Sequence, residues 1–267
     1  MKDTTETKAL YNTMAIDIAD KLNAVRKIIH SEQKTRPPQM DALFPAYNRV
    51  PVGVAREYEI MGHRAVSEGL DALAEHHAVQ FEHLATTLGT VIHGIDLKQP
   101  LSPEIIALIR QTLLERKVIF FRGQDLSEDQ QVAFGRCFGE LDAFPFGKPG
   151  KNPYILEILH NAYSPGTENS WHTDVTWMEC PSHGSIAQCT QVPPYGGDTL
   201  FADSHAAYHG LPTKIQEQIR DLSGINDYRV FLGRGGVAMP EDLIKEIKAR
   251  IPFGVAHPLV RTHPETH

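Results

Sequence analysis

From about residue 154 to the last residue, short stretches rich in β-forming residues alternate with turn residues. Ser164-Pro165-Gly166 and Pro193-Pro194-Tyr195-Gly196-Gly197 are two such turns. Proline and glycine there end one extended segment and allow the next to begin, which is typical of short strands in antiparallel sheets. We therefore expect an α+β fold whose core is a jelly roll, also called a double-stranded β-helix, flanked by helices.

Helix signals precede and interrupt the β-rich region. Ser102-Pro103-Glu104 supplies an N-cap, a first-turn proline and a first-turn acid, which predicts a helix that ends near Arg116. Ser127 and Gln130 have capping-box spacing, which predicts a second helix that stops at Gly139. The other expected elements are strands over residues 89–97 and 118–121, the second one buried, and helices over residues 213–222 and 241–250.

The first 77 residues have a different pattern. From Leu10 to Ile29, apolar residues recur every three or four positions, as on one face of an amphipathic helix. A proline-bearing linker over residues 36–51 and a second helix from about residue 62 to 77 follow. We expect residues 1–77 to form a helical extension and residues 78–267 to form the jelly-roll domain. The extension then docks on that domain or on a second subunit, so a homo-oligomer is one expected arrangement.

Composition excludes several classes of protein. The net charge of -7 argues against nucleic-acid binding, which normally requires a basic surface. No stretch reaches the roughly 18 apolar residues of a membrane helix, and the acidic start is unlike a signal peptide. The 3 cysteines lack CxxC spacing, which indicates neither a disulfide framework nor a cysteine zinc site. A cytoplasmic protein that acts on small molecules is the expectation.

The strongest local motif is Trp171-His172-Thr173-Asp174. On an extended strand, side chains alternate, so His172 and Asp174 would project from one face and Thr173 from the other. One imidazole and one carboxylate make two-thirds of the two-histidine, one-carboxylate triad that binds ferrous iron and leaves positions open for other ligands. A histidine and an aspartate two residues apart also occur by chance as a hydrogen-bonded pair on a sheet surface, so the motif needs its context.

Three blocks supply that context: the motif at residues 171–174, the diglycine block at 193–202, and His-Pro-Leu-Val-Arg-Thr-His-Pro-Glu-Thr at 257–266. In this order they resemble the family of 2-oxoglutarate-dependent oxygenases that includes taurine dioxygenase, alkylsulfatases and phenoxyacetate-degrading dioxygenases. The resemblance runs from about Phe81 to the last residue. Residues 1–77 lie outside it.

The resemblance implies a site and a reaction. His172 and Asp174 match the first two Fe(II) ligands, Thr199 matches a residue whose hydroxyl helps to bind a 2-oxoglutarate carboxylate, and Trp171 is expected to pack under the site and limit water. The implied reaction is hydroxylation of a small organic acid, sulfonate or sulfate ester by O2. It is coupled to decarboxylation of 2-oxoglutarate to succinate and CO2.

The substrate loop departs from the taurine-cleaving members of the family. Those members carry a histidine and a tyrosine that contact the sulfonate, and simple alignment puts Phe144 and Gly147 at the two places. We therefore expect taurine to be a poor substrate. Two phenylalanines in this loop favour a more apolar or aromatic substrate, although Phe144 and Phe146 could equally fill the core.

The third iron ligand and the arginine that pairs with 2-oxoglutarate fall beyond the last block in relatives, and the sequence stops inside that block. We therefore expect a truncated chain that binds iron weakly. His257, His263 and His267 are alternative ligands, but the first two belong to a structural motif in relatives and a terminal residue is prone to fray. The same truncation would leave strand edges unpaired and favour association with another chain.

Two further function classes remain open. One is a zinc hydrolase that uses His172 and Asp174, although the chain has neither HExxH nor cysteine ligands at metal spacing. The other is a degenerate jelly-roll module that only binds a ligand. Other histidines are not expected to bind a metal. The pairs His76/His77 and His205/His209 are expected to be solvated or to cap helices. His160 and Asn161 are expected to lie near the mouth of the site.

Overall fold

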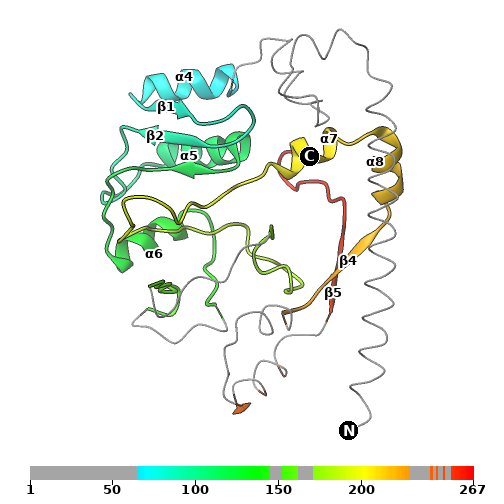
Figure 1. The fold of residues 1–267 in the computed structure, drawn as a ribbon. Helices are drawn as coiled ribbons and strands as arrows, with labels where there is room; N and C mark the ends of the chain where they lie inside the picture. Colours follow the sequence, from blue (N-terminus) through cyan, green and yellow to red (C-terminus); the bar gives the residue numbers. More distant parts are fainter. Residues whose placement is uncertain are drawn as a thin grey trace. The chain divides into compact units, whose positions relative to one another are not determined.

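The computed structural model describes residues 65–144, 152–161, 171–228, 241, 242, 245, 249 and 254–267. The chain divides into two compact units, one of residues 1–64 and 202–220 and the other of residues 65–201 and 221–267. The described helices are α4 (Glu68–His76), α5 (Pro103–Arg116), α6 (Glu128–Arg136), α7 (Ser204–His209) and α8 (Thr213–Ile219). The described strands are β1 (Gln80–His83), β2 (Thr90–His93), β3 (Ile119–Phe120), β4 (Ser223–Asn226) and β5 (Val255–Pro258) (Figure 1).

The second unit contains a three-stranded sheet in the order β1-β2-β3, which follows α4 in the chain. β1 and β2 pair antiparallel with Gln80 opposite His93, and β2 and β3 pair parallel with Thr90 opposite Ile119. The parallel pair is joined by α5, as a parallel connection requires a crossover. Just after β2, Gly94 has a φ of 90°, and a Cβ there would meet the Ala78 carbonyl oxygen at 2.8 Å, so this turn requires glycine.

Both predicted helix starts are confirmed. The Ser102 side chain accepts a hydrogen bond from the Ile105 backbone N–H at the start of α5. At the start of α6, Ser127 and Gln130 satisfy each other's backbone N–H in a full capping box. Both caps form between residues three apart, which is why the sequence alone reveals them.

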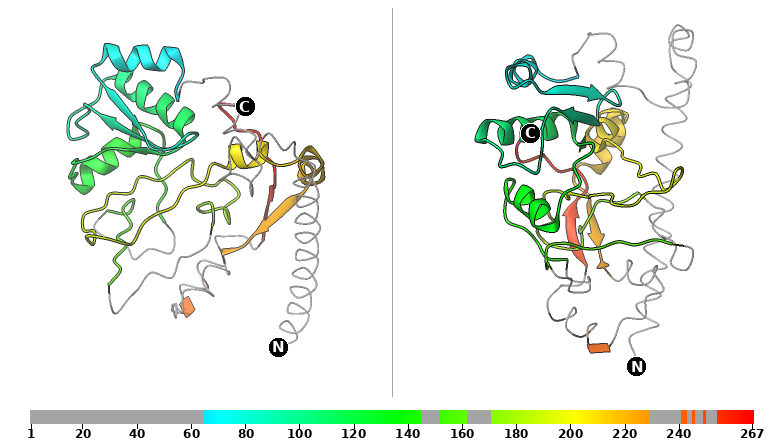
Figure 2. Two further views of the ribbon diagram at one scale, coloured as in Figure 1. Left: turned by 45° about the horizontal axis from the view of Figure 1, so that its top comes forward. Right: turned by 90° about the vertical axis from the view of Figure 1, so that its left-hand side faces the viewer.

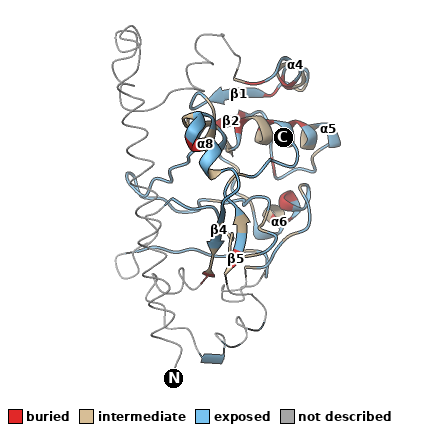
Figure 3. Cartoon of the chain, turned by 90° about the vertical axis from the view of Figure 1, so that its right-hand side faces the viewer, coloured by how far each residue is buried: buried red, intermediate tan, exposed pale blue. Residues whose placement is uncertain are grey.

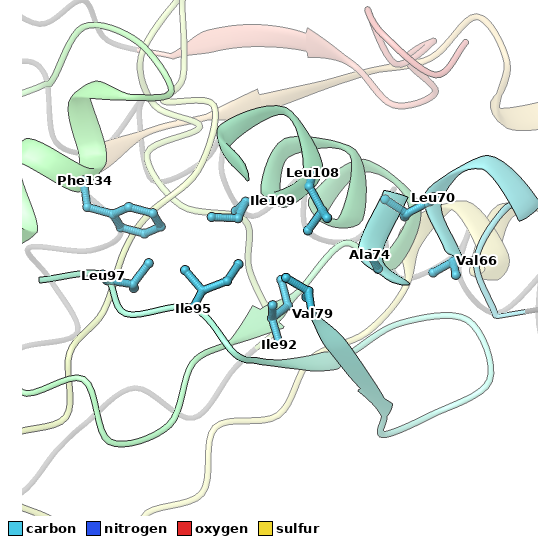
Figure 4. Packing of buried hydrophobic residues seen from close by; sticks show 10 residues of the cluster. All are labelled: Val66, Leu70, Ala74, Val79, Ile92, Ile95, Leu97, Leu108, Ile109 and Phe134. Carbon is cyan, nitrogen blue, oxygen red and sulfur yellow. The ribbon is translucent and has the colours of Figure 1, made fainter. Parts of the chain in front are cut away.

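One hydrophobic cluster joins the sheet to its helices. Figure 4 shows Ile92 and Val79 on the strand side facing Leu108 and Ile109 of α5, with Phe134 of α6 at one end. Both views in Figure 2 place α4 and α5 beside the β1–β2 hairpin, and buried residues in Figure 3 gather on α4, β2 and α6. The other members of the cluster are Val66, Leu70, Ala74, Ile95 and Leu97.

α4 therefore packs into the core of the unit that contains β1–β3. The predicted boundary between residues 77 and 78 stays a prediction, but the hydrophobic face of α4 (Leu70 and Ala74, with Val66 before it) is buried in this cluster. The predicted helix over residues 10–29 and the linker over residues 36–51 lie outside the described residues. The described residues within 241–250 are helical, as expected.

Two predictions about strands need correction. The strand predicted over residues 118–121 is half-buried, because β3 lies at the edge of the described sheet: Ile119 packs on the core, and the Phe120 ring instead meets Phe201, 6.2 Å away between centroids. Residues 171–201 contain no strand, although strands were expected there. The described part thus has the expected α+β composition, and the jelly roll itself stays a prediction.

The last strands form a separate two-stranded sheet. β4 and β5 pair antiparallel, with Ser223 opposite Pro258 and Asn226 opposite Val255. The backbone N–H of Leu259 also donates to the Leu222 carbonyl and extends the pairing. In the first unit, α7 begins at an Asp203 N-cap and α8 ends at Ile219, three residues before the expected end.

The described part of the chain contains no helix that is both long enough and apolar enough to cross a membrane. Cys137, Cys180 and Cys189 are free thiols, in agreement with the expectation that they form no disulfide framework.

Candidate metal centre

His172 and Asp174 are brought together as predicted, but by a different backbone. Nε2 of His172 lies 3.1 Å from Oδ1 of Asp174. The expected strand is absent: residues 171–173 belong to no sheet, and residues 174–177 form a turn. Alternation on a strand is therefore the wrong explanation for the convergence: the contact forms in an irregular segment, and Asp174 is the first residue of the turn that follows.

This spacing fits a metal ion. Adjacent ligand atoms on an octahedral ion with bonds of about 2.1 Å lie about 3.0 Å apart. The two donor atoms of this pair have nearly that separation, and both side chains are more than half exposed to solvent. An imidazole nitrogen with a carboxylate oxygen is also a donor set that ferrous iron accepts.

The pair supplies two ligands and the described residues add no third. No group of three or more histidine, cysteine, aspartate and glutamate side chains is arranged to hold a metal ion in the part of the chain that the structure describes. The pair thus has the donor set and spacing of two corners of a facial triad, and its role as an iron-binding pair stays a prediction.

The turn that carries Asp174 is backbone-strained. Val175, the next residue, has a φ of 50°, a left-handed conformation that β-branched residues rarely adopt. Such a conformation costs on the order of 1–3 kcal/mol and persists only where surrounding contacts enforce it. Within the turn, the Met178 backbone N–H donates to the Val175 carbonyl at 2.9 Å.

Trp177, at the end of the same turn, lies between two aromatic rings. Its ring centroid is 6.4 Å from that of Phe144 and 6.4 Å from that of Tyr228, both edge to face. Tyr228, with only 1% of its surface exposed, anchors this cluster. The prediction that Trp171 packs under the site is wrong: its side chain is 70% exposed, because residues 171–173 join no sheet that could be covered, and Trp177 takes the packed position.

His257 contacts the site turn from β5. Its Nε2 lies 2.9 Å from the Met178 carbonyl oxygen, and because a carbonyl only accepts, Nε2 carries the proton and donates. His263 instead orders its own turn, where its Nδ1 accepts from the backbone N–H groups of Glu265 and Thr266. The sequence suggested that both histidines are either substitute ligands or part of a structural motif, but it did not reveal the His257 contact, which joins residues 79 apart.

Ion pairs between side chains join the C-terminal residues to the rest of the second unit. Arg110 of α5 donates to Oε2 of Glu265 from Nη2 at 2.7 Å and from Nε at 3.1 Å. His183, on the segment that follows the site turn, has its Nε2 3.8 Å from Oε1 of the same carboxylate.

The remaining predicted residues are placed less decisively. Thr199 is exposed, after a turn in which Gly196 and Gly197 both have positive φ, and its role stays a prediction. Phe144 is half-buried against Trp177, and Gly147 lies outside the described residues. The paired histidines lie as neighbours, with ring centroids 4.9 Å apart for His76/His77 and 4.4 Å for His205/His209, and His77 is the C-cap of α4.

An imidazole and a carboxylate at ligand spacing define a candidate centre of a mononuclear metalloprotein. The chain belongs to the taurine catabolism dioxygenase TauD, TfdA family, whose model matches residues 80–267. The resemblance noted in the sequence is thereby confirmed, and the matched region contains His172, Asp174 and Thr199.

Individual relatives support this family membership. The chain is 32% identical over 194 residues to an alkylsulfatase from Acinetobacter baylyi, covering 70% of this chain and 60% of that protein. It is 33% identical over 195 residues to an alpha-ketoglutarate-dependent sulfate ester dioxygenase from Pseudomonas putida, covering 70% and 64%. Among solved structures, a taurine dioxygenase from Burkholderia xenovorans superposes with a TM-score of 0.55 at 34% identity, covering 70% of this chain and 60% of that one. The chain therefore spans less than two-thirds of the length of these relatives.

Proposed function

We propose that this chain carries the iron-binding part of an Fe(II)- and 2-oxoglutarate-dependent dioxygenase that hydroxylates a small organic acid, sulfonate or sulfate ester. The observation that carries the proposal is the 3.1 Å separation of His172 Nε2 and Asp174 Oδ1 within the region that the family model matches. The names of the relatives, an alkylsulfatase and a sulfate ester dioxygenase, support this substrate range.

His172 and Asp174 would hold the iron, and the Thr199 hydroxyl would donate a hydrogen bond to a carboxylate of 2-oxoglutarate. Bound iron with 2-oxoglutarate would supply the activation of O2 that hydroxylation needs. The protein's part is to present the imidazole nitrogen unprotonated and the carboxylate ionised, and to keep both at ligand spacing. Phe144 and Gly147 stand where taurine-cleaving members carry a histidine and a tyrosine that contact the sulfonate, which favours a substrate other than taurine.

The test is an anaerobic titration of the purified chain with Fe(II) and 2-oxoglutarate, followed by the visible charge-transfer absorption of the chelate. We expect the band in the wild type and its loss in His172→Ala and in Asp174→Ala. Thr199→Val should keep the band but weaken 2-oxoglutarate binding by about 1–2 kcal/mol, the scale of a hydrogen bond to a charged group. A full band in His172→Ala would contradict the proposal, and a zinc hydrolase or a ligand-binding module would give none.

A further inference from the structure

We propose that His257 is a positioning residue for the candidate metal centre: by donating from Nε2 to the Met178 carbonyl, it holds the turn at residues 174–178, which begins at Asp174, in its strained form. The part of this inference that concerns metal binding rests on the proposed function. The part that concerns the conformation of the turn does not.

The argument begins with the strain. Asp174 contacts His172 and is the first residue of the turn, in which Val175 has a φ of 50°. A β-branched residue leaves this conformation unless something outside the turn prevents it. The backbone hydrogen bond from Met178 N–H to Val175 O lies inside the turn, so it does not tie the turn to the rest of the fold.

Two outside contacts meet the end of the turn at adjacent residues. Trp177 is packed between Phe144 and Tyr228, which restricts the side chain, and His257 binds the Met178 carbonyl at 2.9 Å, which restricts the backbone. His257 lies within β5, whose pairing with β4 gives it a rigid base. A hydrogen bond from a paired strand can therefore fix the Met178 carbonyl, and with it the course of the turn.

The same bond also explains why His257 is a poor choice for the third ligand. A carbonyl acceptor requires a proton on Nε2, so this nitrogen has no lone pair for a metal ion while the contact exists.

The chain offers a direct optical reporter, since its 2 tryptophans, Trp171 and Trp177, both belong to the site segment. In a Trp171→Phe background, all tryptophan emission arises from Trp177 in the turn. Glutamine carries an amide nitrogen where histidine has Nε2, whereas the amide of asparagine ends near the Nδ1 position. His257→Gln therefore conserves the donor, and His257→Asn and His257→Ala remove it.

The experiment compares Trp177 emission and acrylamide quenching of the metal-free variants, with far-UV circular dichroism and urea unfolding to show that each is folded. We expect His257→Asn and His257→Ala to shift emission to the red and to increase quenching, and His257→Gln to resemble the parent. If alanine prevents folding, the asparagine and glutamine pair decides. Equal emission in all variants, or a glutamine variant as perturbed as asparagine, would overturn the proposal.

Co(II) titration of the same variants then tests the link to the metal. Loss of a residue that orients a ligand typically weakens metal binding 10-fold or more, so we expect about a tenfold loss in His257→Asn and a near-parental affinity in His257→Gln. If the parent binds no metal but emission follows the expected order, the proposed function fails and the positioning of the turn stands. If the parent binds metal and emission and affinity are the same in every variant, the positioning fails and the proposed function stands.

Discussion

A single buried hydroxyl joins His83 to Arg116. Thr90, fully buried on β2, accepts a hydrogen bond from Nε of Arg116 at 2.9 Å, and its Oγ1 also lies 2.9 Å from Nδ1 of His83. The imidazole is therefore held close to a fixed positive charge. Burial and the nearby Arg116 charge lower the pKa of His83 below its usual value, against a smaller raising effect of Asp71.

We predict that this histidine makes the fold acid-sensitive. Because its pKa is lower in the folded than in the unfolded chain, the unfolded state takes up the proton first, and the contribution to stability is present above the unfolded value and lost as the pH falls below it. Urea unfolding from about pH 7.5 to 5 should show a smaller decline in His83→Asn, which keeps an acceptor near the Nδ1 position but does not titrate. An identical decline in both proteins would contradict the role of His83.

At the scale of one element, the stability of α6 depends on its N-cap residue, Ser127. Ser127 and Gln130 close the capping box, and the helix carries Val132 and Phe134 into the core, where the Phe134 ring contacts Phe121 and Phe138 at 5.9 and 5.2 Å. Ser127→Ala should lower the free energy of unfolding by about 1 kcal/mol, because the Gln130 backbone N–H loses the Ser127 hydroxyl as its acceptor.

Ser127→Asp is the matched control for this prediction, since aspartate is as good an N-cap as serine and adds a favourable charge at the helix N-terminus. Denaturant titrations of the three proteins should rank alanine below serine and aspartate. If alanine and aspartate are equally unstable, the cap is not the cause.

At the scale of the whole second unit, Arg116 is the buried polar residue that binds several segments to one another. Only 1% of its surface is exposed, and it donates to Thr90 and to five backbone carbonyls: Ala65, Ala85, Thr86, Leu88 and Gly89. One guanidinium thus fixes the approach to α4, the loop between β1 and β2, and the end of α5. Its planar donor fork suits this task better than an ammonium group would.

Arg116→Met should therefore destabilise the fold severely, by about 3 kcal/mol or more, because it removes all the hydrogen bonds that one buried guanidinium makes to Thr90 and five backbone carbonyls. Arg110→Met is the matched control on the same helix: its partly exposed ion pair with Glu265 should be worth about 1 kcal/mol or less. Thermal and urea unfolding of both variants test the contrast. A loss at Arg116 no larger than that at Arg110 would refute its central role.

A feature was predictable from the sequence when the residues that form it lie close together in the chain. The caps at Ser102 and Ser127 were predictable because each is completed by a residue three positions away. The pairing of His172 with Asp174 was predictable for the same reason, and so was family membership, which rests on blocks in chain order. The predicted strand over the motif was wrong because a strand also needs a paired neighbour, and residues 171–173 belong to no sheet.

Contacts between distant segments decided the rest. Trp171 and Trp177 are equally large and apolar, and nothing local distinguishes them; Trp177 is packed because Phe144 and Tyr228 come from segments 33 residues before it and 51 after it. The sequence offered His257 as a possible metal ligand. In the structure, its Nε2 instead donates a hydrogen bond to the carbonyl of Met178, 79 positions away. Residue type determines which groups a side chain can bind, and only the folded backbone, by bringing remote segments within hydrogen-bond distance, determines which of them it does bind.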